Sequence, residues 1–113
     1  MQERRKEERL PCAIHARLSS VEEKNRVCCT AIDLSEAGCR VASNGAHVFG
    51  ADHIYVELTS PDRQKITVLG RIEWTDGEWV TAQTVGVRFL AMMPSDRKRL
   101  RTVIGELKEG TRI

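Results

Sequence analysis

Six short segments in which apolar or β-branched residues alternate with polar ones constrain the fold most strongly. Alternation places successive side chains on opposite faces of a strand, so one face is buried and the other is solvated. Six such segments predict an all-β, mostly antiparallel barrel or sandwich. The segments are Ala13 to Leu18, Val27 to Asp33, Cys39 to Ala42, His53 to Leu58, Ile66 to Trp74 and Thr84 to Leu90.

Turn-forming residues separate the predicted strands, as this architecture requires. In the last two segments one face is apolar, and we expect that face to point into the core. The turns are Ser35-Glu36-Ala37-Gly38, Asn44-Gly45, Ser60-Pro61-Asp62 and Asp76-Gly77. The expected inward residues are Ile66, Val68, Ile72, Trp74, Val85, Val87 and Phe89.

The C-terminal part of the chain has a helical period instead. Its apolar residues lie at i, i+3, i+4 and i+7, which is typical of a helix with one buried face. Ser95 is a suitable N-cap and Asp96 suits the first turn. The pattern predicts a helix over residues 95–108 that lies against the barrel on Leu100, Val103, Ile104 and Leu107.

A chain of 113 residues is the usual size of one domain. We therefore expect a single domain over residues 1–113, with a barrel over residues 12–91. Residues 1–11 are mostly charged and offer little to a core, so they predict a flexible N-terminal arm.

Composition argues against several classes of protein. The formal net charge of +2 is too small to predict binding to a nucleic acid polymer. No apolar stretch is long enough to insert into a membrane, and the N-terminus lacks the apolar core of a signal peptide, so we expect a cytoplasmic protein. The four cysteines contain no C-x-x-C pair, which favours reduced thiols over disulfides or a metal site.

Arginines are prominent in the predicted arm, at Arg4, Arg5 and Arg9. One interpretation is a solvated tail with local ion pairs. The other is that Arg5 and Arg9, four residues apart, project from one side of a turn and converge on a ligand. A guanidinium suits a phosphate or the O6 and N7 edge of guanine, because it is always charged and presents a planar fork of donors.

A second polar group stands where the second predicted strand ends, in the pattern Asp33-x-Ser35-x-x-Gly38. It is either an ordinary turn or part of a binding site. Asp33 and Ser35 alternate along the chain, so we expect them to form an outward polar surface with Leu34 pointing inward. A carboxylate can accept hydrogen bonds from N1 and N2 of guanine, and Gly38 permits close approach or a positive φ.

The two motifs, in this order, resemble the PilZ domain family, which joins an R-x-x-x-R arm to D/N-x-S-x-x-G on a barrel. The pattern Gly86-Val87-Arg88-Phe89 near the end of the last strand is also similar to that family. The resemblance covers essentially the whole chain. It implies a six-stranded β-barrel with a C-terminal helix.

The resemblance also implies a receptor for cyclic di-GMP in bacterial second-messenger signalling, in which the arm closes over the ligand. The ligand would contact Arg5, Arg9, Asp33, Ser35 and Gly38, with no cofactor or metal. In this family an additional arginine just before the R-x-x-x-R pattern is associated with an intercalated ligand dimer. Arg4 occupies that position, so we expect two ligand molecules and an as yet unidentified protein partner.

Other interpretations remain open. A PilZ-like module that binds no nucleotide and acts through protein contacts is the main alternative, and a small oligonucleotide-binding barrel is another. An enzyme is not expected, because no nucleophile with a base, metal cage or phosphate loop is visible. A second R-x-x-x-R, from Arg97 to Arg101, is assigned to the solvent face of the helix. Arg40, Arg71 and Arg88 are expected to point outward and are given no role.

Overall fold

The computed structural model describes residues 8–21, 26–42, 53–76 and 84–110. Arg4 and Arg5 lie outside the described residues, as does the turn at Asn44-Gly45. The side chain of Trp74, which was expected to face the core, and Gly77 of the Asp76-Gly77 turn also lie outside the described part of the structure.

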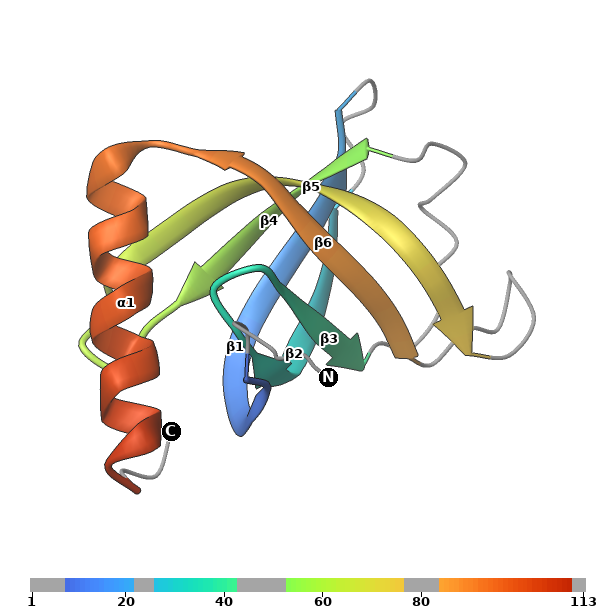
Figure 1. Ribbon diagram of the computed structural model, residues 1–113. Coiled ribbons are helices and arrows are strands. Elements are labelled where there is room, and N and C mark those ends of the chain that lie inside the picture. The colour runs from blue at the N-terminus through green and yellow to red at the C-terminus, as the bar shows by residue number, and fades with distance from the viewer. Residues whose placement is uncertain (1–7, 22–25, 43–52, 77–83, 111–113) are drawn as a thin grey trace, which may run out of the picture.

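Within the described residues, six antiparallel strands form a closed barrel in the order β1-β2-β3-β6-β5-β4 (Figure 1). The predicted fold class is therefore confirmed. Closure depends on two pairings between strands that are distant in sequence, β1 with β4 and β3 with β6. The strands are β1 (Leu10–Ser20), β2 (Arg26–Leu34), β3 (Gly38–Ala42), β4 (His53–Thr59), β5 (Lys65–Asp76) and β6 (Thr84–Met92).

The barrel begins earlier than the sequence indicated, since Leu10 and Pro11 belong to β1 and not to the arm. Leu10 lies opposite Leu34 of β2 and Pro11 lies opposite Asp33. Leu10 also packs against the core. Pairing with β2 thus extends the strand up to the charged segment.

One helix, α1 (Pro94–Lys108), follows β6 and packs against β5 and β1 (Figure 1). The expectation that Ser95 caps this helix is wrong. Met93 is the N-cap, without a side-chain hydrogen bond, and Pro94 opens the first turn. Proline suits that position because its φ is already helical and its missing N–H would have no partner within the helix.

Asp96 fastens the start of α1 to the barrel. Its Oδ1 accepts a hydrogen bond from the backbone N–H of Thr67 on β5 at 3.4 Å. The same oxygen lies 3.5 Å from the guanidinium of Arg99, one turn further along the helix. An acidic side chain in the first turn also complements the positive end of the helix dipole.

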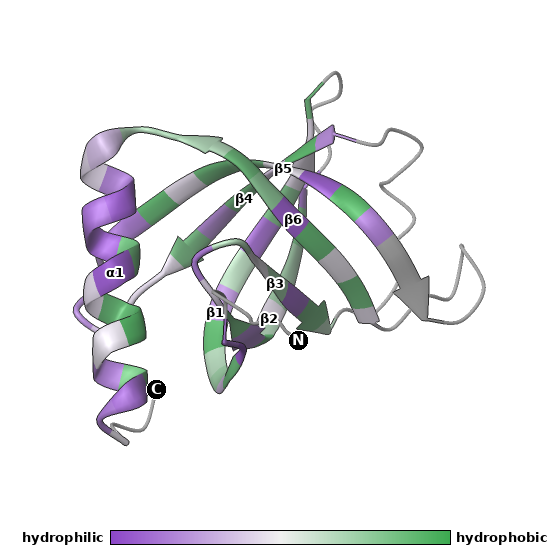
Figure 2. Cartoon of the chain, viewed as in Figure 1, coloured by the Kyte–Doolittle hydropathy of each residue, from purple (hydrophilic) through white to green (hydrophobic). Residues whose placement is uncertain are grey.

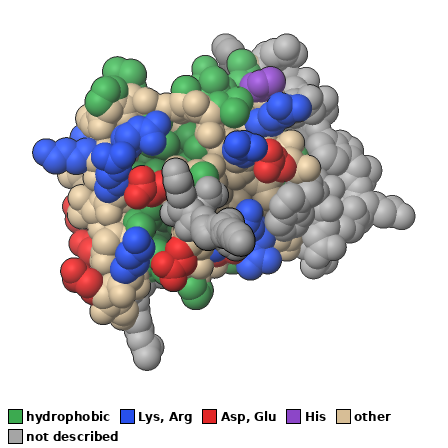
Figure 3. Space-filling view, in the orientation of Figure 1, with side chains coloured by type: hydrophobic (Ala, Val, Ile, Leu, Met, Phe, Trp, Pro, Cys, Tyr) green, Lys and Arg blue, Asp and Glu red, His purple; other side chains and the backbone are tan. Residues whose placement is uncertain are grey.

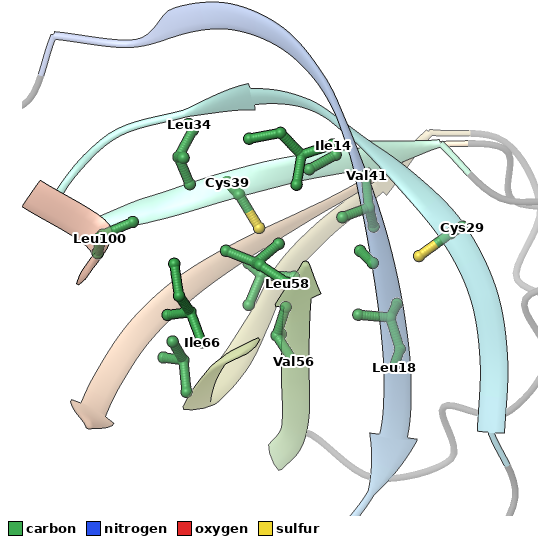
Figure 4. Packing of buried hydrophobic residues seen from close by; sticks show 14 of the residues in the cluster. Ile14, Leu18, Cys29, Leu34, Cys39, Val41, Val56, Leu58, Ile66 and Leu100 are labelled. Atoms are coloured by element: carbon green, nitrogen blue, oxygen red, sulfur yellow. The ribbon is translucent and has the colours of Figure 1, made fainter. Parts of the chain in front are cut away.

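The core fills the barrel and extends under α1 (Figure 4). Apolar and polar residues alternate along the strands, and Figure 2 shows the same alternation in hydropathy. Ile66, Val68, Val85 and Val87 are buried as predicted, whereas Ile72 and Phe89 are only partly buried. The buried helix residues are Leu100, Val103 and Ile104, with Leu107 partly buried.

Among the helical residues that the structure describes, none belong to a segment long and apolar enough to cross a bilayer. Charged side chains of both signs are interspersed over the described face in Figure 3, in keeping with the small net charge.

Candidate functional site

The turn between β2 and β3 is built around the side chain of Ser35. Its Oγ accepts hydrogen bonds from the backbone N–H groups of Ala37 and Gly38, both at 3.1 Å. The hydroxyl donates to the carbonyl oxygen of Gly38 at 3.3 Å, and the Ser35 N–H donates to the same oxygen at 2.9 Å. Ser35 is only 3% exposed. Its first role is therefore to close this turn.

Asp33 is held by the strand that leaves the turn. Its Oδ1 accepts the backbone N–H of Arg40 at 3.1 Å, and its Oδ2 accepts Nε of Arg40 at 2.5 Å. An extra residue in β2 between Ala31 and Asp33 shifts the register at this point. Such a bulge re-aims the side chain that follows it.

The expectation of an open polar surface formed by Asp33 and Ser35 needs correction. Asp33 is 5% exposed, so both side chains are buried. The physical reason is that each is engaged by local partners, Arg40 for the carboxylate and the backbone of the turn for the hydroxyl. Leu34 between them is fully buried, as predicted.

Gly38 is required by the barrel itself. A Cβ at this position would stand inside van der Waals contact with the carbonyl oxygen of Val87 and 3.4 Å from Cα of Arg88. Gly38 lies opposite Arg88 in the β3–β6 ladder, and the Phe89 N–H donates to the carbonyl oxygen of Ala37 at 2.7 Å. The close neighbour of Gly38 in the structure is thus the backbone of β6, and close contact with a ligand stays a prediction.

Arg9 meets this turn because of the register of β1 and β2. Leu10 lies opposite Leu34, so the residue before β1 falls beside the residue after β2. Arg9 is exposed, and with Ser35 and Gly38 it lines a shallow hollow of about 170 Å³. We call this space the motif hollow. Its lining residues are Arg9, Ser35, Ala37, Gly38, Glu73, Val87 and Arg88.

Two arginines that were expected only to point outward have specific positions here. Arg40 orients Asp33, and Arg88 lines the motif hollow, where Nη1 of its guanidinium lies 3.5 Å from Oε2 of Glu73. The partnership of Arg40 with Asp33 was accessible from the sequence, because a hairpin closed at Ser35 to Gly38 pairs these two positions. The position of Arg88 depends on the β3–β6 pairing, for which no local signal exists.

The turn also contacts α1. Oε1 of Glu36 lies 3.3 Å from Nε of Arg101, and both side chains are half exposed or more. Arg101 belongs to the second R-x-x-x-R. Its exposed position on α1 agrees with the assignment to the solvent face, although its side chain reaches Glu36 of the Asp33-x-Ser35-x-x-Gly38 turn.

A larger hollow, of about 270 Å³, lies between the β4–β5 turn and α1. Pro61, Arg99 and Val103 are among its lining residues. None of the predicted site residues that the structure describes line it. The motif hollow is therefore the better candidate, because it joins Arg9 to the second motif.

The cysteines do not form a reactive site within the described residues. Burial raises the pKa of Cys12 to about 11 and that of Cys29 to about 12. Burial also raises the pKa of Cys39, with smaller contributions from Cys29, Asp33 and Cys12. No cluster of three metal-binding side chains occurs in the described part of the chain. All four thiols are free.

Comparison with known protein families identifies the class of domain to which this barrel, with its Asp33-x-Ser35-x-x-Gly38 turn, belongs. A family model described as the PilZ domain matches residues 3–106. The chain therefore belongs to the PilZ domain family. No curated protein matched it.

Solved structures with the same fold include the PilZ domain with c-di-GMP of YcgR from Escherichia coli, with a TM-score of 0.70 and 15% identity. That match covers 96% of this chain and 94% of the other. The K. pneumonia MrkH–c-di-GMP complex has a TM-score of 0.75 at 14% identity, covering 96% of this chain and 54% of the other. The Bacillus subtilis inhibitor of motility MotI has a TM-score of 0.74 at 11% identity, and the match covers 95% of this chain and 52% of MotI. The chain thus spans about half the length of MotI and of MrkH.

Proposed function

We propose that this domain is a receptor for cyclic di-GMP and acts by binding and not by catalysis. The observation that carries the proposal is that Arg9 and the Ser35–Gly38 turn line one hollow, although they lie 26 or more residues apart in the sequence. Membership of the PilZ family supports it. Two solved structures of the same fold, the PilZ domain of YcgR and MrkH, are complexes with c-di-GMP.

In this proposal the rigid half of the site is the turn. Asp33 is 5% exposed and is not among the residues that line the motif hollow, so guanine would have to displace part of the covering chain to reach it. The N1 and N2 donors of guanine would then use lone pairs that Arg40 leaves free, because each carboxylate oxygen can accept more than one bond. Arg40 holds that carboxylate in place before the ligand arrives, which lowers the entropic cost of binding.

Ser35 has a narrower role than the motif alone suggested. Its oxygen already accepts two N–H groups and its proton is directed to the carbonyl oxygen of Gly38. A hydroxyl offers one donor and two acceptor sites, so Ser35 would have to give up the 3.3 Å bond to Gly38 in order to donate to the ligand. Its main contribution would be the shape of the turn.

The second half of the proposed site is the arm, with Arg4, Arg5 and Arg9 on guanine and phosphate groups. Closure of this arm over the ligand would present an altered surface to a protein partner. The proposal includes two stacked ligand molecules per chain, with Arg4 contacting the second. A micromolar dissociation constant is expected, because ordering an arm consumes part of the energy of the charged hydrogen bonds.

Calorimetric titration with cyclic di-GMP tests the proposal, with GMP and cyclic di-AMP as competing chemistries. Saturable binding of cyclic di-GMP alone is expected, with a loss in Arg9→Ala and in Asp33→Ala. Arg97→Ala is the matched control, because it belongs to the second R-x-x-x-R. A folded wild type that binds none of the nucleotides would refute the receptor and favour the protein-interaction module.

The same titration tests the ligand number. About two cyclic di-GMP molecules per chain are expected for the wild type and about one for Arg4→Ala. A wild-type value near one would reject the stacked pair without affecting the receptor.

A further inference from the structure

The wall of the motif hollow that belongs to β6 carries a second guanidinium, that of Arg88. Arg88 lies opposite Gly38 in the β3–β6 ladder and lines the hollow together with Arg9 and Ser35. Gly38 has no side chain, so nothing from β3 stands between the turn and β6 at this pair. The hollow therefore has an arginine from the chain before β1 and another from a strand of the barrel.

Arg88 is held only weakly by its partner within the protein. Nη1 of its guanidinium lies 3.5 Å from Oε2 of Glu73 on β5, and the two side chains are 64% and 45% exposed. Ion pairs this exposed contribute little to stability, because water screens them and holding two long side chains costs entropy. The pair can thus separate at small cost.

Glu73 also lines the hollow, so it competes for the place that an anion would take. A guanidinium binds carboxylate and phosphate through the same planar fork of donors. A phosphate that enters the hollow would be attracted by the guanidinium of Arg88 and repelled by the carboxylate of Glu73, which is paired with Arg88.

We propose that Arg88 is a ligand-contacting residue that binds a phosphate of the dinucleotide, and that Glu73 weakens binding by occupying Arg88 until the ligand displaces it. This inference rests on the proposed cyclic di-GMP receptor function and adds a residue to it. Arg88 supplies a charge from a strand whose backbone is fixed in the barrel, whereas Arg9 lies before the first strand.

Titration of cyclic di-GMP into four proteins tests this role: the wild type, Arg88→Gln, Glu73→Gln and the double variant. The dissociation constant is expected to rise about tenfold in Arg88→Gln, as for loss of one charged hydrogen bond, and to fall about threefold in Glu73→Gln. In the Arg88→Gln background, Glu73→Gln should have little effect, because the carboxylate then has no guanidinium to occupy.

Arg17→Gln is the matched control. Arg17 also forms a cross-strand ion pair with a glutamate, Glu57 at 3.7 Å, which is partly exposed, but Arg17 lines a different hollow. The Arg17→Gln protein should bind cyclic di-GMP with the same affinity as the wild type. The gain expected in Glu73→Gln cannot arise from misfolding, so the test survives even if Arg88→Gln is unstable.

Wild-type affinity retained within twofold in a folded Arg88→Gln protein would overturn the contact. An equal gain from Glu73→Gln in both backgrounds would overturn the competition, since it would reflect repulsion of the ligand by the carboxylate alone. Absence of binding by the wild type would instead refute the receptor function, which separates the two failures.

Discussion

The same glycine-to-alanine change should have opposite effects at two positions of this domain. At Gly38 the added methyl would collide with the carbonyl oxygen of Val87, inside the 3.0 Å that real Cβ atoms essentially never reach. At Gly105, in the interior of α1, it would meet nothing within 4 Å. Gly105 is thus a matched control for the chemistry of the substitution.

The magnitudes follow from which atoms must move. Overpacking usually costs about 1–3 kcal/mol, and the upper end applies at Gly38 because the obstacle is backbone and not a flexible side chain. Separating β3 from β6 there would also weaken a ladder hydrogen bond, worth about 1 kcal/mol. We expect Gly38→Ala to lower the free energy of unfolding by about 3–4 kcal/mol. Gly105→Ala should raise it by about 0.5–1 kcal/mol, since alanine loses less backbone entropy in a helix.

Urea denaturation of both variants, followed by circular dichroism, measures these changes as shifts in the free energy of unfolding. Gly70→Ala is an informative intermediate, because its nearest obstacle is the side-chain Cγ1 of Val87 at 2.6 Å, with a backbone oxygen at 3.1 Å. The reasoning would be refuted if Gly38→Ala were as stable as the wild type. If Gly38→Ala were stable but bound the ligand poorly, Gly38 would be shown to contact the ligand. If Gly38→Ala is destabilised, weaker binding does not show such a contact.

Three further predictions concern other parts of the domain. Arg40→Met should weaken cyclic di-GMP binding at least several-fold in the wild type, but should weaken it little further in an Asp33→Asn protein, because Arg40 acts through the Asp33 carboxylate. Calorimetry that showed the same loss of affinity in the wild-type and Asp33→Asn backgrounds would contradict this. At pH 8 an alkylating reagent should modify exposed Cys28 much faster than Cys39, because Cys39 is buried and burial raises its pKa. Above about pH 9 the Cys39 thiol of the unfolded chain loses its proton while that of the folded chain keeps it, so the free energy of unfolding should fall as the pH rises. That fall should be less steep in Cys39→Val. Leu100→Ala should cost about 3 kcal/mol in urea denaturation, since this fully buried side chain joins α1 to the core, and a cost below about 1 kcal/mol would show that α1 is not part of the cooperative unit.

Much of the barrel was predictable because local pattern and tertiary environment agree along its strands. Each predicted strand has one buried face, and burial of Ile66, Val68 and Val85 follows directly from alternation. The start of β1 was not predictable in the same way. Leu10 and Pro11 follow a charged segment, and only their pairing with Leu34 and Asp33 brings them into the barrel.

The helix boundary shows how one local rule can be overridden by another. Ser95 has the side chain of an N-cap, but Pro94 before it already meets the requirements of the first helical position. The helix therefore begins earlier, and Asp96 turns to the barrel to accept the N–H of Thr67. That last contact joins residues 29 positions apart and has no signature in the local sequence.

The candidate site divides along the same line between local and distant contacts. The pattern Asp33-x-Ser35-x-x-Gly38 identified the turn, but it could not show that two of its side chains are already bonded within the protein. Alternation along the strand predicted that Asp33 and Ser35 point outward, whereas the bulge and the short turn bury both side chains against neighbouring residues. Arg88 and Glu73 could not be assigned at all, because their place beside this turn exists only once β3 pairs with β6.

These contacts also bear on how a receptor of this kind could report its ligand. The backbone of the turn is fixed by Ser35, by the carbonyl oxygen of Ala37 and by the fit of Gly38 against β6, so displacing it would break several hydrogen bonds at once. The ion pairs around it, Glu36 with Arg101 and Glu73 with Arg88, are exposed and can exchange partners at small cost. A ligand in the motif hollow would therefore rearrange surface charges and the chain before β1, and leave the barrel unchanged. The pair between Glu36 and Arg101 joins the same turn to α1, so it is the contact through which such a rearrangement would reach the helix.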